Sequence, residues 1–164
     1  MSTNDLTILK TAILNEAEGE HFYQLAAENS SNHDVKNAFM FLAEDEKQHG
    51  VWLHEMMQCL APGQTFDMKR LESHMGVDSP QIFNLSKAQG TQNTLEISVF
   101  HIGILMEKAS LDYYREAALS TGNPDARNLY ETLAKWEMHH LDELEKAYDS
   151  LREDWFDHQG FSPA

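Results

Sequence analysis

The chain has 164 residues, of which 27 are acidic and 12 are basic, so its formal net charge is −15. This length suits a single domain with a buried core, 1–164, and the acidic balance argues against nucleic acid or an anionic membrane as a partner. A single cysteine excludes an intrachain disulfide. No apolar run approaches the ~20 residues of a membrane span, and the N-terminus lacks the features of a signal peptide. We therefore expect a cytoplasmic protein.

Residues at about 5–60 have the spacing of two amphipathic helices joined by a short link, which predicts an antiparallel helical hairpin. The apolar stripe of the first helix also carries Glu16 and Tyr23, and that of the second carries Glu46 and His49. Asn32 is a suitable N-cap for the second helix. These polar side chains occupy positions that the pattern reserves for the core.

A stretch at about 61–92 separates this hairpin from the next periodic segment. It opens with Ala61-Pro62-Gly63 and shows no sustained period, although 67–75 has the composition of one short helix. A connection of this length can return along the bundle. The third helix is then expected to start at the same end as the second, as in four-helix bundles with one crossover.

The second hairpin is predicted at about 93–153, with Asn123-Pro124 as the N-cap and first turn of its second helix. Its stripes carry Glu107 and Tyr114, then Glu137 and His140. The aromatic tail at 154–164 is expected to pack on the bundle or on a partner subunit.

The two hairpins are copies of one unit. An offset of 91 residues superimposes residues 12–55 on 103–146, with 14 identical positions in 44. The identities include both copies of the motif Glu-x-x-His and both of the preceding Glu-x6-Tyr motifs. A single Glu-x-x-His is weak evidence, because helix surfaces are rich in glutamate, but two copies in register indicate a duplicated site. The expected fold is all-α, a four-helix bundle of two repeated antiparallel hairpins.

Four glutamates in a bundle interior need compensating positive charge, since an uncompensated buried carboxylate costs several kcal/mol. No lysine or arginine lies on these stripes. Two divalent metal ions would balance four carboxylates, and mixed oxygen and imidazole donors suit iron, manganese or zinc. A metal-free structural bundle is the least favoured alternative.

These residues and their spacing resemble the rubrerythrin-like branch of the ferritin-like di-iron carboxylate superfamily. The resemblance implies two iron ions, with Glu46 and Glu137 bridging or chelating. It also implies hydrogen bonds from Tyr23 and Tyr114 to the ligand carboxylates, and it makes a homodimer plausible. The full set of implied metal ligands, which would be catalytic through the metal centre, is Glu16, Glu46, His49, Glu107, Glu137 and His140.

The sequence departs from rubrerythrins in two respects. With Cys59 alone, the chain has no rubredoxin-type CxxC pairs, so electrons would come from a separate donor protein. An extra glutamate of the third helix is also missing, because the stripe neighbours of Glu107 are Gly103 and Ser110. Glu20 lies one turn from Glu16 and could serve as a movable ligand, but a solvated role is favoured because its repeat partner is Leu111.

Two functions remain open from the sequence. The leading hypothesis is a non-haem di-iron oxidoreductase that reduces hydrogen peroxide or dioxygen. The alternative is iron handling, in which the site oxidises or holds Fe(II) for delivery or storage.

Overall fold

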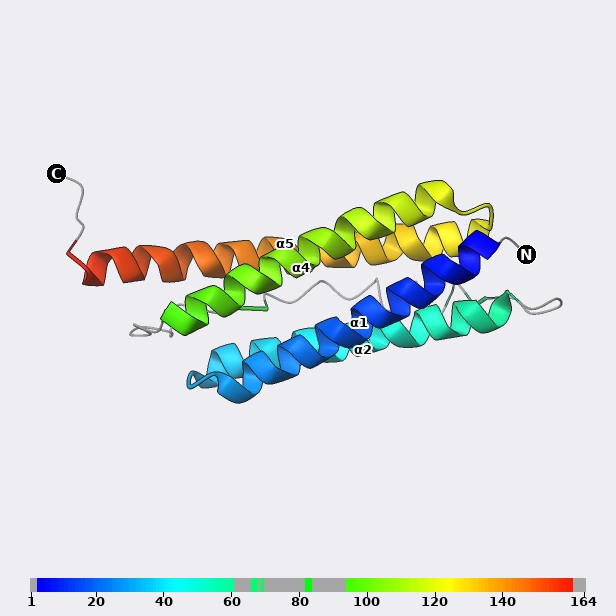
Figure 1. Cartoon of the computed structure of the whole chain (residues 1–164). Coiled ribbons are helices and arrows are strands. Elements are labelled where there is room, and N and C mark those ends of the chain that lie inside the picture. The colour runs from blue at the N-terminus through cyan, green and yellow to red at the C-terminus, as the bar shows by residue number, and fades with distance from the viewer. Residues whose placement is uncertain (1–2, 61–65, 68, 70–81, 84–93, 161–164) are drawn as a thin grey trace.

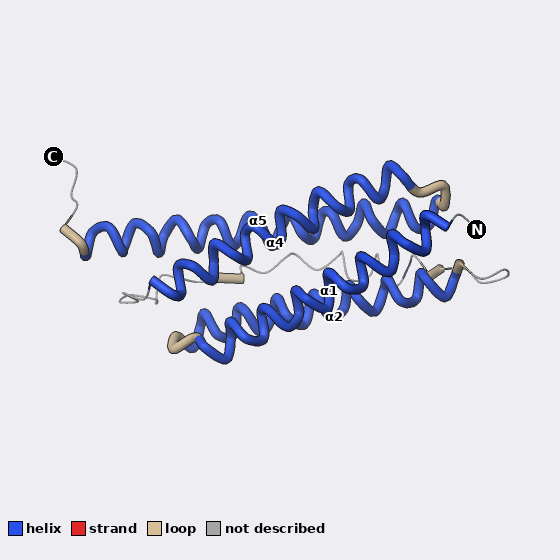
Figure 2. The backbone as a smooth tube through the Cα atoms, in the orientation of Figure 1, coloured by secondary structure: helices blue, strands red, loops and turns tan. Residues whose placement is uncertain are grey.

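The computed structural model describes residues 3–60, 66–67, 69, 82–83 and 94–160. Helix is the only regular structure in these ranges (Figure 2), which confirms the all-α prediction. None of the helices described has the length and apolar character of a membrane-spanning segment. The helices are α1 (Thr3–Asn29), α2 (His33–Cys59), α4 (Thr94–Ser120) and α5 (Pro124–His158).

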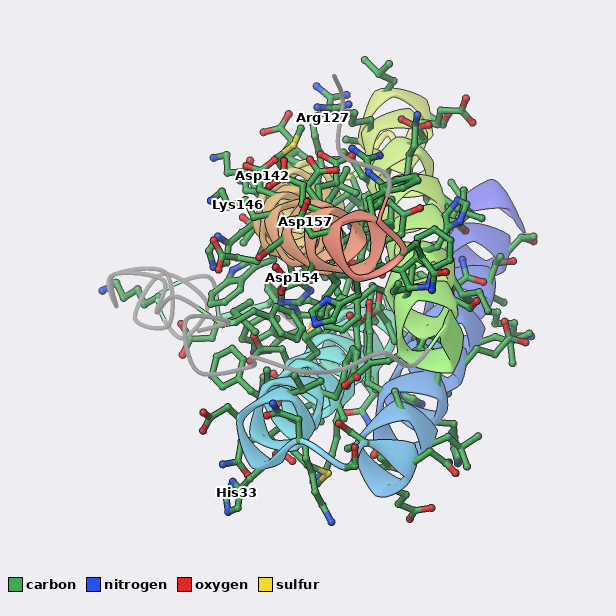
Figure 3. All side chains as sticks on the ribbon, turned by 90° about the vertical axis from the view of Figure 1, so that its left-hand side faces the viewer. His33, Arg127, Asp142, Lys146, Asp154 and Asp157 are labelled. Carbon is green, nitrogen blue, oxygen red and sulfur yellow. The ribbon has the colours of Figure 1, made fainter. Side chains whose placement is uncertain are left out.

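The helices form two antiparallel pairs, α1 with α2 and α4 with α5, which lie side by side as a four-helix bundle (Figure 1). The end of α2 and the start of α4 lie at opposite ends of the bundle, so α2 and α4 run in the same direction. This is the arrangement that a returning crossover predicts. Seen along the bundle, charged side chains such as Asp142 and Lys146 point outward (Figure 3).

Both predicted N-caps are confirmed. The Asn32 side chain accepts hydrogen bonds from the backbone N–H groups of Asp34 and Val35, at 2.9 and 3.1 Å. Asn123 repeats this geometry at the start of α5, with distances of 2.9 and 3.2 Å, and Pro124 follows as the first helical residue. Each asparagine satisfies backbone donors that have no partner within the helix.

Within the described residues, the core consists of two apolar clusters. One contains Leu9, Trp52 and Tyr114, and the other contains Tyr23, Leu42 and Phe100. Along α1 the chain passes from the first cluster, at Leu9, through Glu16 to the second, at Tyr23, and the other three helices show the same order or its reverse. The buried polar residues therefore form a belt at mid-bundle with apolar packing on both sides.

The C-terminal part differs from the prediction. Helix α5 continues past the expected end at 153 to His158 and projects beyond the other helices (Figure 1). Trp155 is partly buried, whereas Phe156 is 44% exposed and does not pack into the bundle. Contact with a partner subunit stays a prediction, and 161–164 lie outside the described residues. The short helix expected at 67–75 also falls almost entirely outside them.

Alanine at either cap should destabilise the protein, because two backbone N–H groups would lose their acceptor. We expect Asn32→Ala and Asn123→Ala each to lower the free energy of unfolding by about 1 kcal/mol in urea denaturation. Asn128→Ala is the matched control, since Asn128 is exposed within α5 and alanine favours helix there. Equal losses in all three variants would contradict the capping role.

Candidate metal centre

The structure brings all six predicted ligand residues together at the centre of the bundle. Each helix contributes: α1 and α4 one glutamate each, α2 and α5 one glutamate and one histidine each. None of the six is more than 4% exposed. They are Glu16, Glu46, His49, Glu107, Glu137 and His140.

The donor atoms fall into two overlapping groups, within each of which they lie less than 4.8 Å apart. Glu46 and Glu137 belong to both groups. The first group adds Glu16 and His49, and the second adds Glu107 and His140. Two adjacent ions could share the carboxylates of Glu46 and Glu137, and each ion would then have one further glutamate and one histidine. This grouping follows the repeat, because each group takes its additional glutamate and histidine from one hairpin.

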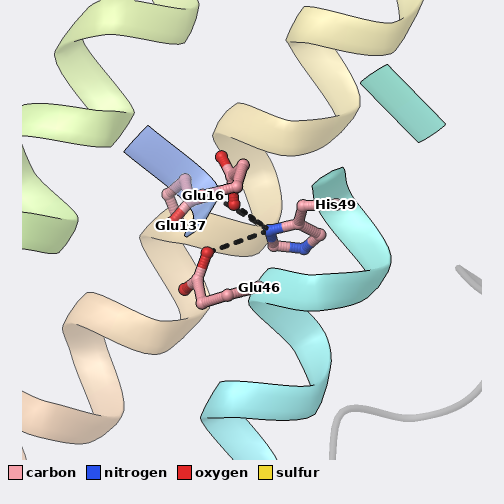
Figure 4. A group of neighbouring side chains, drawn as sticks. All are labelled: Glu16, Glu46, His49 and Glu137. Atoms are coloured by element: carbon pink, nitrogen blue, oxygen red, sulfur yellow. Dashed lines mark hydrogen bonds and ion pairs between the residues drawn. The ribbon is translucent and has the colours of Figure 1, made fainter. Parts of the chain in front are cut away.

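In the first group, four side chains from α1, α2 and α5 point toward one another (Figure 4). The Nδ1 atom of His49 lies 3.2 Å from a carboxylate oxygen of Glu16 and 3.2 Å from one of Glu137. The corresponding distance to Glu46 is 3.5 Å. A single imidazole nitrogen thus faces three carboxylates.

The second group has the same construction around His140. Its Nδ1 atom lies 3.4 Å from an oxygen of Glu46, 3.6 Å from one of Glu107 and 4.0 Å from one of Glu137. Both histidines therefore turn the same ring nitrogen inward and leave Nε2 facing away from the four glutamates.

The two tyrosines bind the carboxylates across the repeat. The hydroxyl group of Tyr23 in α1 donates a hydrogen bond to Glu107 of α4, and that of Tyr114 in α4 donates one to Glu16 of α1. In each glutamate the other carboxylate oxygen faces the inward histidine nitrogen. The hydrogen bonds therefore orient the two glutamates and leave one oxygen of each available as a ligand.

Several donor atoms are buried without a hydrogen-bond partner among the described residues. They include Oε2 of Glu107, Oε2 of Glu137 and Nδ1 of His140. Buried polar atoms are rarely left unpaired, because each costs about 1–3 kcal/mol. These atoms all face the space between the carboxylates, so metal ions at that place would satisfy them. The donor set fits two divalent ions.

The comparison with known proteins agrees with this geometry. The sequence profile of the rubrerythrin family matches residues 7–148. The chain belongs to the rubrerythrin family. A solved structure of a hypothetical protein from Pyrococcus furiosus is similar, with a TM-score of 0.69 and 20% identity over 91% of this chain and 90% of that chain. At this identity the likeness shows a common fold. No curated protein matches the sequence.

Charge in this rubrerythrin-family site is balanced by protons when metal is absent. Burial, followed by repulsion from Glu46, raises the pKa of Glu16 to about 8. Burial and the neighbouring carboxylates also raise the pKa of Glu137. Burial opposes the charged form of both histidines, yet the surrounding carboxylates outweigh it and raise the pKa values of His49 and His140.

Glu46 is the exception, because it accepts hydrogen bonds from several of these protonated groups. Burial alone would raise its pKa, but the contacts with Glu16, His140 and His49 lower it well below the ordinary value. Near neutral pH the metal-free centre therefore holds protons where the loaded centre would hold cations, and metal binding must release them.

One residue that contacts the centre was not found from the sequence. A carboxylate oxygen of Asp45 lies 3.2 Å from Nε2 of His140. Asp45 directly precedes the predicted ligand Glu46, and this adjacency was the signal available in the sequence. Its repeat partner is Trp136, so a search for features shared by the two halves passes over it.

The remaining polar candidates lie outside the cluster. Glu20 is partly buried and accepts a hydrogen bond of 3.0 Å from Gln24. His139, which precedes His140 in α5, is partly buried. The other histidines in the described ranges are exposed: His21, His33, His54, His101 and His158.

Gly19 provides space for the carboxylate of Glu46. A Cβ atom at this position would lie 3.3 Å from Cγ and 3.4 Å from the carboxyl carbon of Glu46. Gly19→Ala should displace Glu46 and weaken Fe(II) binding about tenfold in calorimetry, with helix content retained. Gly122→Ala is the control, because a Cβ atom there would meet nothing within 4 Å beyond its chain neighbours. Unchanged affinity in Gly19→Ala would refute this role.

The stability of the metal-free protein should fall as pH rises from about 5 to 8. Glu16 and Glu137 have raised pKa values in the folded state, so the unfolded chain loses their protons first as pH increases. The raised histidine pKa values act in the same direction above about 6.5. Tm measured by calorimetry in a chelator should decrease across this range, and addition of Fe(II) should flatten the profile. A rising Tm without metal would contradict the proton balance.

Proposed function

We propose that this protein binds two iron ions at the buried centre and uses them to reduce hydrogen peroxide or dioxygen with electrons from a separate donor protein. The observation that carries the proposal is the pair of donor groups sharing Glu46 and Glu137. Membership of the rubrerythrin family supports iron over manganese or zinc. All three metals suit the donor atoms.

Bound as a ferrous pair, iron supplies the two electrons that, with two protons, convert hydrogen peroxide into two water molecules. The protein contributes a site that the two apolar clusters shield from bulk water. Tyr23 and Tyr114 keep their hydroxyl protons, because burial and the adjacent glutamates raise their pKa values well above the ordinary value of 10. They therefore hold Glu107 and Glu16 in place throughout.

Iron oxidation for storage or delivery is the second candidate. The observation in its favour is the net charge of −15, which would concentrate Fe(II) around the surface. Both candidates use the same centre, and they differ in whether electrons return to it after one oxidation.

Anaerobic titration with Fe(II) should show a stoichiometry of two. The double substitution Glu46→Ala and Glu137→Ala should abolish this binding, because it removes the two carboxylates common to both groups. Glu18→Ala is the control, since Glu18 is exposed on α1 and should leave the stoichiometry at two. Retained binding in a folded double variant, checked by far-UV circular dichroism, would refute the ligand set.

Rapid mixing of the ferrous protein with peroxide or dioxygen separates the two functions. With a chemical reductant in excess, the oxidoreductase should consume many equivalents of peroxide per centre. A ferroxidase should complete one oxidation and then stop or release its iron. Consumption of a single equivalent in the presence of reductant would therefore favour iron handling.

A further inference from the structure

The two halves of the centre differ behind the histidine ligands. His140 is fully buried, and its outward nitrogen, Nε2, lies 3.2 Å from Oδ2 of Asp45, whose side chain is 21% exposed. The imidazole is thus held between the inner carboxylates at Nδ1 and a separate carboxylate at Nε2. Asp45 comes from α2 and His140 from α5, so this contact also joins the two hairpins.

His49 has an apolar environment at the same place. The repeat partner of Asp45 is Trp136, and the Trp136 ring lies 6.1 Å from the His49 ring between centroids. The Trp52 ring lies on His49 as well, at 5.8 Å. Nε2 of His49 is buried and has no hydrogen-bond partner in the part of the chain that the structure describes.

Trp136 alone does not distinguish the two histidines, because its ring is also 6.5 Å from that of His140. The inner carboxylates do not distinguish them either, since each histidine faces Glu46, Glu137 and one further glutamate. The differences that remain are the Trp52 ring beside His49 and the carboxylate of Asp45 beside His140. Of these two, only the carboxylate adds charge and can accept a hydrogen bond from an imidazole nitrogen.

We propose that the two metal positions are unequal, and that Asp45 makes the position at His140 the tighter one, which fills first. An imidazole whose second N–H is donated to a carboxylate is fixed in orientation and tautomer and is a stronger donor to a metal at its other nitrogen. Asp45 also adds one negative charge near that position. It acts through His140, so it is a positioning residue.

The inference rests on the proposed di-iron function and adds an order of loading to it. At low iron concentration, the protein would hold one ion among Glu46, Glu107, Glu137 and His140. Completion of the pair would then depend on the weaker position at His49. The second ion, and with it the two-electron chemistry, would be gained or lost over a range of iron concentration in which the first stays bound.

Anaerobic Fe(II) calorimetry at one pH tests the order. The unmodified protein should show two separate steps of one ion each. Asp45→Ala should weaken the first step by about 10–100-fold and leave the second nearly unchanged, so that the steps merge. Asp45→Asn should lose less, because its amide oxygen can still accept the N–H bond.

Glu44→Gln is the matched control. Glu44 precedes Asp45 in α2 and its side chain is 71% exposed, paired with Lys47 at 3.1 Å. The substitution removes the same unit of charge without touching His140, so both steps should stay as they are in the unmodified protein. A loss equal to that of Asp45→Asn would assign the effect to general charge and overturn the role of Asp45.

Mössbauer spectra with one equivalent of ⁵⁷Fe(II) give a readout independent of turnover. The unmodified protein should show one ferrous doublet, and Asp45→Ala should show two of similar intensity. Binding of both ions with equal affinity in the unmodified protein, or a weaker second step alone in Asp45→Ala, would overturn the inference. A stoichiometry of two in the same titration would still support the proposed function. Absence of any Fe(II) binding in the folded protein would overturn both.

Discussion

Four carboxylates gathered in the dry interior of a helical bundle are the constraint on which the rest of this structure depends. Glu16, Glu46, Glu107 and Glu137 are nearly inaccessible to solvent, and their mutual repulsion must be balanced. Without metal, protons on the two histidines and on Glu16 and Glu137 balance this charge. Two divalent ions carry the matching charge without those protons. The centre is therefore best understood as a charge balance that either protons or metal can complete.

The fold serves this balance while holding the two hairpins together. The helix backbones come closest within each pair, α1 with α2 and α4 with α5, and the two pairs meet mainly through side chains. The polar belt spans that boundary: Tyr23 reaches Glu107, Tyr114 reaches Glu16, and Asp45 reaches His140. Because the apolar clusters close both sides of the belt, the two tyrosine contacts are shielded from water and are stronger than they would be at a surface. The site residues consequently join the halves as well as forming the centre.

Much of this arrangement was predictable because it is periodic or repeated. The stripes predict which faces are buried, the asparagine caps predict where α2 and α5 begin, and the offset of 91 residues predicts which polar residues belong together. The continuation of α5 to His158 was not predicted, because the buried stripe ends at Leu151 and the helix goes on without core packing to mark it. The crossing of Tyr23 to Glu107 depends on the tertiary position of α1 beside α4 and not on spacing within a helix. Asp45 was not predicted as a site residue, because its repeat partner is Trp136 and the repeat identifies only positions that both halves share.

The difference between Asp45 and Trp136 shows where a duplicated protein can carry chemistry specific to one half. After duplication, positions kept identical in both halves define the common requirement, here the carboxylates, histidines and tyrosines. Positions at which the halves differ can act on one half alone. Asp45 against Trp136 is such a pair, and it lies directly behind the imidazole ligands. We expect the carboxylate beside His140, which the repeat replaces with an indole, to give two positions with the same donor atoms different affinities for the same metal. Pseudo-symmetry in the ligands is thus compatible with order in their loading.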